Sequence, residues 1–360
     1  MNAPRKIEPI KKWVVGLDVG SVMTTYSEQR LHGPNPPEQR RIAFPTVVGY
    51  PRQDSRSGED QDRTLYVGKE ALVRYDCLDL VFPLEGTKTK SFRSFADFMH
   101  GIYRPMQLHR SGQPWGVVAQ SATLDVSARQ ELRAAVSDLF DRVILIDDLT
   151  LATTALFRSG DSRCGIVVDL GATATRVSLF SGSAPVDSER VMLPGGGNAV
   201  DNELKDGLGH AFPDLLVSDV TIRLIKEKLG FVSPRGGRRT LSLMLHDVAR
   251  ELDVTPQVRA AGGRLVRDTV DGIKQVLSRC PSDYVEQFVE NIFLFGGGAN
   301  AQGLVEAVQG ALSELGLDSA CVCSVKSPST FIADAALSWG LTLEPQHWQV
   351  PLFSFQESFS

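Results

Sequence analysis

Short apolar runs of strand length recur along this chain, and most of them end in Gly or Asp. Runs of about four to eight apolar residues bounded by turn residues are typical of buried strands in α/β sheets. Five such runs are Trp13–Leu17, Gly116–Ala119, Val143–Ile146, Ile166–Leu170 and Ile292–Phe295. They predict core strands that are followed at their carboxyl ends by loops or helices.

Segments with helical spacing lie between these strands. Apolar residues recur at i, i+3 and i+4 over Val258–Leu277 and Ala301–Leu315, and Ser127–Gln130 forms a capping box ahead of a similar pattern that extends to Phe140. The pattern of an apolar strand followed by Asp and Gly begins again at Cys164, which is weak repetition at the scale of a domain. The sequence therefore predicts an α/β protein with two similar halves.

Other clusters of apolar or polar residues lie outside these elements. Aromatic and Met side chains at helical spacing predict the core of a small subdomain: Phe92, Phe95, Phe98 and Met99. Near the C-terminus, Trp348, Phe353 and Phe355 are apolar for a chain end, and the sequence leaves open whether they dock on the body or face a partner. The polar stretch Pro51–Arg63 predicts a surface loop.

Composition narrows the function classes. The 360 residues are 42% hydrophobic and 22% charged, as in ordinary globular proteins, and the formal charge of -5 gives no general reason to expect a nucleic-acid partner. Five scattered cysteines without a CxxC pair favour neither a disulfide framework nor a zinc site. The first 13 residues lack a signal-peptide core, and no run approaches the roughly 20 apolar residues that span a bilayer. We expect a cytoplasmic protein without direct membrane insertion.

The first candidate for chemistry is the turn that follows the strand at Trp13–Leu17. A Gly at position 20 allows backbone N–H groups to approach phosphate oxygens, and Ser21 adds a hydroxyl donor. Asp18, at the end of the strand, could hold Mg²⁺ through water. The bulky pair Val22 and Met23 completes this candidate phosphate-binding turn, and Met here favours packing over recognition.

The second candidate repeats the first about 150 residues later. The strand Ile166–Leu170 carries Asp169 near its end, and the turn Gly171–Thr173 follows. Its residues Gly171, Ala172 and Thr173 are candidate phosphate ligands, and Asp169 is a second candidate for Mg²⁺. If the two turns face each other, their carboxylates flank one Mg-phosphate group.

The third candidate is a run of three glycines after the strand at Ile292–Phe295. Gly296, Gly297 and Gly298 expose backbone against which a flat ring or a phosphate can lie, and Asn300 follows them. Three consecutive glycines alone also fit a tight strand–helix turn. The order of the three segments along the chain is the more specific signal.

In that order, the segments resemble the phosphate-1, phosphate-2 and adenosine motifs of the actin, heat-shock-70 and hexokinase superfamily. The resemblance implies an actin-like bilobed α/β fold of two ribonuclease-H-like halves with small inserted subdomains, and ATP/ADP with Mg²⁺ as ligands. It places the first lobe at 1–157 with a subdomain at 38–108, the second at 158–335 with a subdomain at 190–262, and a returning C-terminal segment at 336–360.

The resemblance also assigns residues between the motifs. The segment Ile222–Val232 is similar to the actin segment whose Arg, Lys and Glu approach the nucleoside, which implicates Arg223, Lys226 and Glu227. The turn Gly195–Asp201 resembles the Gly-Gly-Asp turn of MreB and implicates Gly197 and Asn198. Asp148 occupies the position of the glutamate that activates water in the bacterial actins.

Segments outside the nucleotide motifs resemble the MamK subfamily of magnetosome-forming bacteria. They are Thr46–Pro51, Leu78–Leu84, Gly197–Asp201 and Pro345–Trp348. The resemblance implies self-association into cytoskeletal filaments that position magnetosomes or similar organelles, with a related actin or an organelle-linked adaptor as a further partner. The alternative is a non-filamentous or co-polymerising regulator that holds nucleotide.

Departures from the family pattern fall at the phosphate end and predict weak or slow ATP hydrolysis. Asp148 is one methylene shorter than the usual glutamate, and displacement of a catalytic group by about 1 Å costs roughly a hundredfold in rate. Thr173 replaces a glycine, which would crowd a phosphate or change the backbone shape. Arg176 replaces an aspartate, and strand alternation favours an outward-facing side chain over a phosphate contact.

Overall fold

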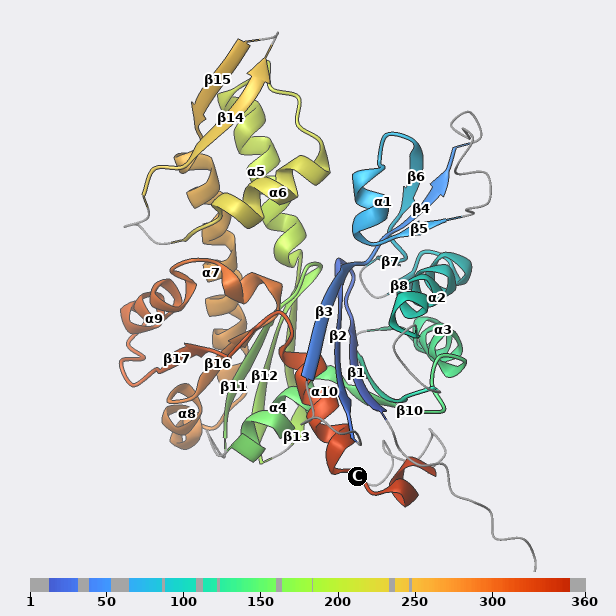
Figure 1. Cartoon of the computed structure of the whole chain (residues 1–360). Coiled ribbons are helices and arrows are strands. Elements are labelled where there is room, and N and C mark those ends of the chain that lie inside the picture. Colours follow the sequence, from blue (N-terminus) through green and yellow to red (C-terminus); the bar gives the residue numbers. More distant parts are fainter. Residues whose placement is uncertain are drawn as a thin grey trace, which may run out of the picture. The chain divides into compact units, whose positions relative to one another are not determined.

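The chain divides into two compact units. This computed structural model describes residues 13–31, 39–52, 65–85, 88–107, 113–121, 124–159, 164–182, 184–232, 237–245 and 248–349. The first unit comprises residues 1–151 and 332–360, and the second comprises 152–331 (Figure 1). The chain leaves the first unit within α4 (Asp148–Ser159) and returns to it at the start of α10 (Phe331–Thr342). The sequence-based division had placed these passages at 157 and 335.

A mixed five-stranded sheet forms the centre of the first unit. The strands lie in the order β10-β9-β1-β2-β3. Their bounds are β10 (Arg142–Asp147), β9 (Trp115–Gln120), β1 (Trp13–Val19), β2 (Met23–Arg30) and β3 (Gln39–Pro45). The hairpin strands β1, β2 and β3 are antiparallel, whereas β1, β9 and β10 are parallel.

The sheet of the second unit has the same arrangement of strands and the same strand directions, when its order is read from the opposite edge. Its order is β13-β12-β11-β16-β17, with β11 antiparallel to β12, β12 antiparallel to β13, and β11, β16 and β17 parallel. The bounds are β13 (Ala184–Pro194), β12 (Ala174–Ser181), β11 (Cys164–Leu170), β16 (Ile292–Phe295) and β17 (Val322–Ser324). Three antiparallel strands followed by two parallel ones in both units confirm the predicted pair of ribonuclease-H-like halves.

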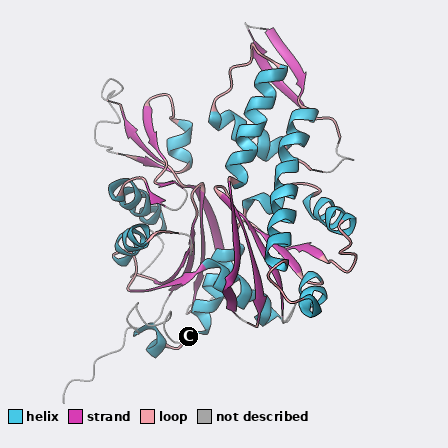
Figure 2. Ribbon diagram, turned by 180° about the vertical axis from the view of Figure 1, so that it is seen from behind, coloured by secondary structure: helices cyan, strands magenta, loops and turns pink. Residues whose placement is uncertain are grey.

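Each unit also carries smaller elements between its sheet strands. In the first unit these are β4 (Val48–Pro51), β5 (Tyr66–Val67), α1 (Lys69–Val73), β6 (Leu78–Val81), β7 (Leu84–Glu85), β8 (Lys88–Thr89) and α2 (Phe92–Gln107). In the second they are α5 (Gly196–Ala211), α6 (Asp219–Leu229), β14 (Thr240–Leu245) and β15 (Val248–Asp253). Figure 2 distinguishes these helices and strands by colour.

Helices cover the sheets because the apolar stripe of each helix packs against the buried residues of the strands. In the second unit α7 (Thr255–Leu277) packs on β12 and β13, while α8 (Ser282–Val289) and α9 (Leu304–Glu314) pack against β11 and β17. In the first unit α10 crosses β1 so closely that a Cβ at Gly16 would lie 2.1 Å from the carbonyl oxygen of Ala333. A side chain at position 16 would separate the helix from the strand, so glycine is required there.

The predicted start of one helix is wrong. Helix α3 (Val126–Ser137) is capped by Asp125, whose Oδ1 accepts a hydrogen bond from the Ala128 amide at 2.7 Å. Ser127 of the predicted capping box lies inside the helix. An extended backbone at Asp125 places its carboxylate over the first free amides, which is the geometry that an N-cap needs.

The aromatic predictions are confirmed in part. Phe95, Phe98 and Met99 are fully buried in α2, but Phe92, the first residue of the helix, is 46% exposed. Trp348 docks on the first unit, with its ring 5.2 Å from that of Trp115. Phe353 and Phe355 lie outside the described residues, as does most of the predicted loop at 51–63.

Candidate nucleotide site

The turn between β1 and β2 is held by its own backbone and by one threonine. The Gly20 amide donates to the Met23 carbonyl at 3.1 Å. Thr46, just after β3, donates its amide to the Val22 carbonyl at 2.8 Å and its hydroxyl to the Gly20 carbonyl at 2.7 Å. Within the described part of the chain, no backbone carbonyl accepts the amides of Ser21 and Val22. Successive free N–H groups in a turn form an anion-binding concavity.

The turn between β11 and β12 repeats this geometry in the second unit. The Gly171 amide donates to the Ala174 carbonyl, again at 3.1 Å. The carbonyls of Gly171, Ala172 and Thr173 all accept amides from the N-terminus of α5, at distances of 2.7–3.0 Å: the donors are Gly197, Asn198 and Gly195, respectively. The described residues provide no backbone acceptor for the amides of Ala172 and Thr173.

A glycine makes the contact between this turn and α5 possible. Gly196 has φ of 45°, and a Cβ at this position would lie 2.5 Å from the Gly171 carbonyl oxygen and 2.8 Å from the Ala174 amide. Both the left-handed backbone and the absence of a side chain are therefore needed where the helix begins.

Thr173 does not change the backbone shape of the turn. Ser327 is the sole non-glycine residue with positive φ among the described residues, so Thr173 adopts an ordinary conformation. The hydrogen bond that closes its turn is the same as in the first unit, where Val22 occupies the equivalent position. The sequence predicted that a β-branched residue here would either crowd a phosphate or change the backbone shape. The backbone shape is unchanged, so crowding by the side chain stays the predicted effect.

Arg176 points toward Asp169, which corrects the predicted outward orientation. The two residues are directly opposite each other in the β11–β12 register. Arg176 donates through Nε at 3.0 Å and through Nη2 to the same oxygen, Asp169 Oδ2. The side chains are 13% and 10% exposed, so the ion pair is largely removed from solvent. Residues directly opposite each other on neighbouring strands project on the same face of the sheet. Alternation along one strand therefore does not show which side chain Arg176 meets.

This pair makes Asp169 a poor ligand for the Mg²⁺ that the family resemblance implies. Magnesium requires oxygen ligands in near-octahedral geometry, and Asp169 Oδ2 already accepts two N–H groups of a cation. The donor set at Asp169 therefore does not fit the cation. Asp18 lies at the equivalent end of β1, opposite Thr25, and its role toward Mg²⁺ stays a prediction.

The three-glycine segment lies beside the second turn. A Cβ at Gly296, where φ is 87°, would stand 2.5 Å from Asp169 Oδ1, and one at Gly298 would stand 2.8 Å from the Leu170 Cβ. The Asn300 side chain holds this segment by donating to Ser329 Oγ at 2.6 Å and to the Gly297 carbonyl at 3.1 Å. Glycines 296–298 therefore bring bare backbone against the end of β11.

The predicted nucleoside residues of α6 divide into two groups. Lys226 Nζ lies 2.8 Å from Asp201 Oδ1 and donates to the Gly197 carbonyl at 2.9 Å, and Arg223 lies 3.7 Å from the same carboxylate. Glu227 is exposed and has no such contact in the described structure. Asp201 was absent from the predicted site, although its place one helical turn after the Gly195–Gly197 turn could have indicated it.

Arg264, Asp268 and Glu203 form a second ionic cluster close to the start of α5. Arg264 of α7 hydrogen-bonds Asp268 at 2.8 Å and Glu203 at 3.2 Å, and its Nη2 lies 3.7 Å from the position of a Cβ on Gly195. Burial raises the pKa of the Asp268 carboxyl, and the hydrogen bond and charge of Arg264 oppose that rise.

Asp148 is buried at the start of α4. Its Oδ1 accepts the Leu149 amide at 2.8 Å. The preceding Asp147 accepts both the amide and the hydroxyl of Thr150, at 2.9 and 3.1 Å, and so caps the first turn of the helix. A carboxylate held against its own helix is poorly placed to move toward a water molecule.

Sequence reasoning missed two polar residues of the first unit that lie near Asp18. Gln120 and Asp147 are paired at the carboxyl ends of β9 and β10, and Asp18 pairs with Ala119 at the end of β1. Adjacent parallel strands place their carboxyl ends at one edge of a sheet, which is where α/β proteins bind ligands. The strand predictions together with this rule could have found both residues.

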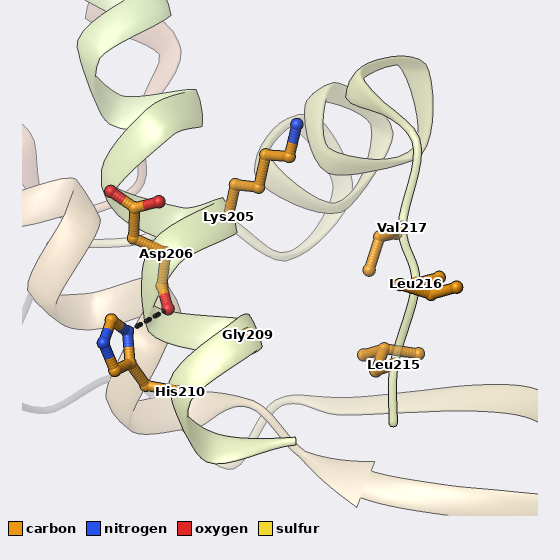
Figure 3. Close-up of a pocket in the computed structure, with 7 residues that line it drawn as sticks. All are labelled: Lys205, Asp206, Gly209, His210, Leu215, Leu216 and Val217. Atoms are coloured by element: carbon orange, nitrogen blue, oxygen red, sulfur yellow. Dashed lines mark hydrogen bonds between the residues drawn. The ribbon is translucent and has the colours of Figure 1, made fainter. Parts of the chain in front are cut away.

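A pocket of about 360 Å³ lies elsewhere in the second unit, between α5 and the segment 215–217 (Figure 3). Lys205, Asp206 and His210 line it from α5, and the His210 ring contacts the Asp206 carbonyl at 2.7 Å. Leu216 on the opposite side is 97% exposed. None of the predicted nucleotide residues lines this pocket.

Known proteins are similar to this chain over most of its length. The chain is 25% identical over 342 residues to the actin-like protein MamK of Magnetospirillum gryphiswaldense, covering 93% of this chain and 90% of the relative. It is 24% identical to MamK of Paramagnetospirillum magneticum, covering 93% and 94%. A search for membrane-spanning segments found no helix, within the described residues, that is long and apolar enough to cross a bilayer.

Two solved structures share the fold. One is a MamK double helical filament, with a TM-score of 0.78, 22% identity and coverage of 92% of this chain and 99% of that one. The other is a non-polymerising MamK mutant bound to AMPPNP, with a TM-score of 0.64, 21% identity and the same coverage. The fold is thus actin-like. Because the MreB/Mbl protein family matches residues 103–326, well over half of the sequence, the chain belongs to that family.

Proposed function

We propose that this protein binds a nucleoside triphosphate of the ATP type through its glycine-rich turns. The observation that carries the proposal is the second-unit turn Gly171–Thr173, whose carbonyls are all used by α5 while the amides of Ala172 and Thr173 have no backbone acceptor in the described chain. Amides left free beside a bare glycine segment suit phosphate oxygens. The family relationship and the AMPPNP complex of a related fold support the same ligand class.

Differential scanning fluorimetry tests the binding proposal. A ligand that binds only the folded state stabilises it by about 2.7 kcal/mol at a concentration 100 times its Kd. We expect ATP and ADP to raise the melting temperature, and adenosine to raise it less, because adenosine lacks the phosphates that the turns would hold. If none of the three compounds changed the melting temperature, the proposal would be contradicted.

We further propose that the protein assembles head to tail into filaments. A heterologous contact that does not close generates a filament, and this chain shares its fold with the subunit of a MamK double helical filament. Sedimentation and negative-stain microscopy with ATP, with ADP and without nucleotide provide the test. Filaments that depend on nucleotide would support the proposal, and monomers at every concentration and in every nucleotide state would contradict it.

Hydrolysis is proposed to be slow. Asp148 is buried, is shorter than the glutamate of related actins and is held by the Leu149 amide, so it has little freedom to position an attacking water. Phosphate release measured under assembly conditions tests this point. A rate typical of an ordinary actin would overturn it.

Two observations favour a second candidate function, a nucleotide-holding regulator that does not form filaments by itself. Asp169, for which the sequence resemblance implies a role toward Mg²⁺, is paired with Arg176, and Asp148, at the position of the water-activating glutamate, is buried. A protein that binds nucleotide without turning it over could instead join the filament of a related actin. Co-sedimentation with such an actin, by a chain that remains monomeric alone, would favour this role over the first.

The cellular role implied by the sequence resemblance is the positioning of magnetosomes or similar organelles, through an adaptor or a related actin. We propose it for the filament-forming candidate. Fluorescence microscopy of a tagged chain in its own host tests it: linear structures along a row of organelles are expected, and uniform cytoplasmic signal would contradict the role.

A further inference from the structure

The carboxylates near the second-unit turn are paired with cationic side chains of the same unit. Asp169, at the end of β11, is paired with Arg176, and Asp201, in α5, is paired with Lys226. Lys226 Nζ is also 3.4 Å from the position of a Cβ on Gly197, whose amide donates to the turn at Gly171. Because Arg223 also lies 3.7 Å from the Asp201 carboxylate, three cationic side chains and two carboxylates form ion pairs near the Gly171–Thr173 turn.

We propose that Arg176 takes the place of a divalent cation at this turn, so that the protein binds a metal-free nucleoside triphosphate about as well as the magnesium complex. This inference rests on the proposed nucleotide binding and specifies the form of the ligand. Arg176 offsets the charge of Asp169, which would otherwise repel the phosphates of the bound nucleotide.

The geometry of the pair favours replacement of the metal over coexistence with it. Two N–H groups of Arg176, on Nε and Nη2, bind one oxygen of Asp169, and the two side chains are about nine-tenths buried. A cation that approached Asp169 would meet the guanidinium charge in an environment with little solvent screening. Displacement of Arg176 would break a largely buried ion pair, which is strongly unfavourable.

The first unit shows what the same hairpin is like without this cation. In the β1–β2 register, Asp18 is opposite Thr25, a neutral residue, where the second unit has Arg176 opposite Asp169. Both hairpins close with the same backbone hydrogen bond. The arginine is therefore not needed to form the turn, and its effect is electrostatic.

Isothermal titration with ATP, in excess MgCl₂ and in EDTA, tests the inference on the full chain. For the unaltered protein we expect the two Kd values to differ by less than about threefold. For Arg176→Met, which leaves the Asp169 charge uncompensated, we expect Kd in EDTA to rise by at least about tenfold and magnesium to restore most of the affinity. Arg238→Met is the matched control, because Arg238 forms an exposed pair with Asp253 in the same unit, at 2.9 Å.

A second measurement needs no nucleotide. Arg176→Asp places two carboxylates opposite each other in the register, which creates oxygen ligands for a cation. We expect MgCl₂ alone to raise the melting temperature of Arg176→Asp by several degrees relative to NaCl of equal ionic strength, and to leave the unaltered protein and Arg238→Met unchanged.

The outcomes separate this inference from the proposed function. Binding of ATP to the unaltered protein only in the presence of magnesium would overturn the inference and leave nucleotide binding standing. Absence of ATP binding in both buffers would overturn nucleotide binding, while the magnesium response of Arg176→Asp would still decide whether Arg176 occupies a cation position. An equal magnesium response in the unaltered protein would overturn that assignment.

Discussion

The hairpins β1–β2 and β11–β12 have the same backbone and different chemistry. Each places an aspartate seven residues before the residue opposite it, and each closes with a glycine amide that donates over 3.1 Å to a carbonyl three residues later. They differ in what holds the turn and in its charge. The hydroxyl and amide of Thr46 hold the first turn, whereas the α5 N-terminus holds the second. Local backbone bonds give the two turns the same shape, whereas the residue opposite the aspartate, Thr25 or Arg176, gives them different charges.

The largest effect is expected from breaking the charge pair that distinguishes the second hairpin. Asp169→Asn removes the carboxylate of a largely buried ion pair, and loss of one partner of such a pair is expected to lower the free energy of unfolding by about 3 kcal/mol. Chemical denaturation measures it. Asp253→Asn removes an exposed pair with Arg238 and serves as the control, with a much smaller change expected. Equal effects of the two substitutions would contradict the assigned burial.

The next effect concerns the glycine that lets α5 reach the second turn. Gly196→Ala adds a Cβ within 2.5 Å of the Gly171 carbonyl oxygen at a positive φ, and we expect a loss of about 2–3 kcal/mol in unfolding free energy. ATP affinity should fall as well, because the turn must shift. Gly209→Ala, in the same helix and with no atom near the added Cβ, should instead stabilise the protein by about 0.5 kcal/mol. If Gly196→Ala were as harmless as Gly209→Ala, the turn would not depend on α5.

The first turn should respond to a change at Thr46. Thr46→Val removes the hydroxyl that donates to the Gly20 carbonyl but retains the shape of the side chain, so a loss of about 1–2 kcal/mol is expected for a buried hydrogen bond. Thr342→Val removes an exposed hydroxyl bond at the end of α10 and should cost less than about 0.5 kcal/mol. Thermal and chemical unfolding of both variants make the comparison.

The smallest effect is expected at Met23. Its carbonyl closes the first turn, but its side chain is exposed, so Met23→Ala should change the unfolding free energy by less than about 0.5 kcal/mol and leave ATP affinity within about twofold. Equilibrium titration and denaturation are the measurements. A large change in either would show that the side chain, and not the backbone, shapes this turn.

Much of the fold could be predicted because strands, helices and turns depend on local patterns of apolar residues and glycines. The strand Ile292–Phe295 agrees with its predicted bounds, since a run of four apolar residues that ends at three glycines has the length and the flanking turn residues of a short buried strand. The repeated Asp-x-Gly motif predicted both turns and the two-fold repetition of the sheet. Asp125 was missed as a helix cap because the choice between two nearby capping residues depends on the backbone that enters the helix.

The candidate site was predicted less completely, and Arg176 shows why. Its type and position were visible, but its orientation was inferred from alternation within one strand. The register of β11 with β12, which decides that Arg176 is opposite Asp169, is a property of two strands. The opposition of Asp18 and Thr25 in the first hairpin is a register of the same kind, and it too is visible only in the structure.

By itself, the sequence determined the strands, the two glycine turns and their order, because these depend on hydrophobic periodicity and on the backbone freedom of glycine. Only the tertiary structure decided which charges meet. Sheet register brings Arg176 to Asp169, and helix packing brings Lys226 to Asp201. The burial of Asp148 likewise depends on groups that are distant along the chain. Electrostatic energy varies with distance and burial, and neither quantity can be determined from the order of residues along a chain.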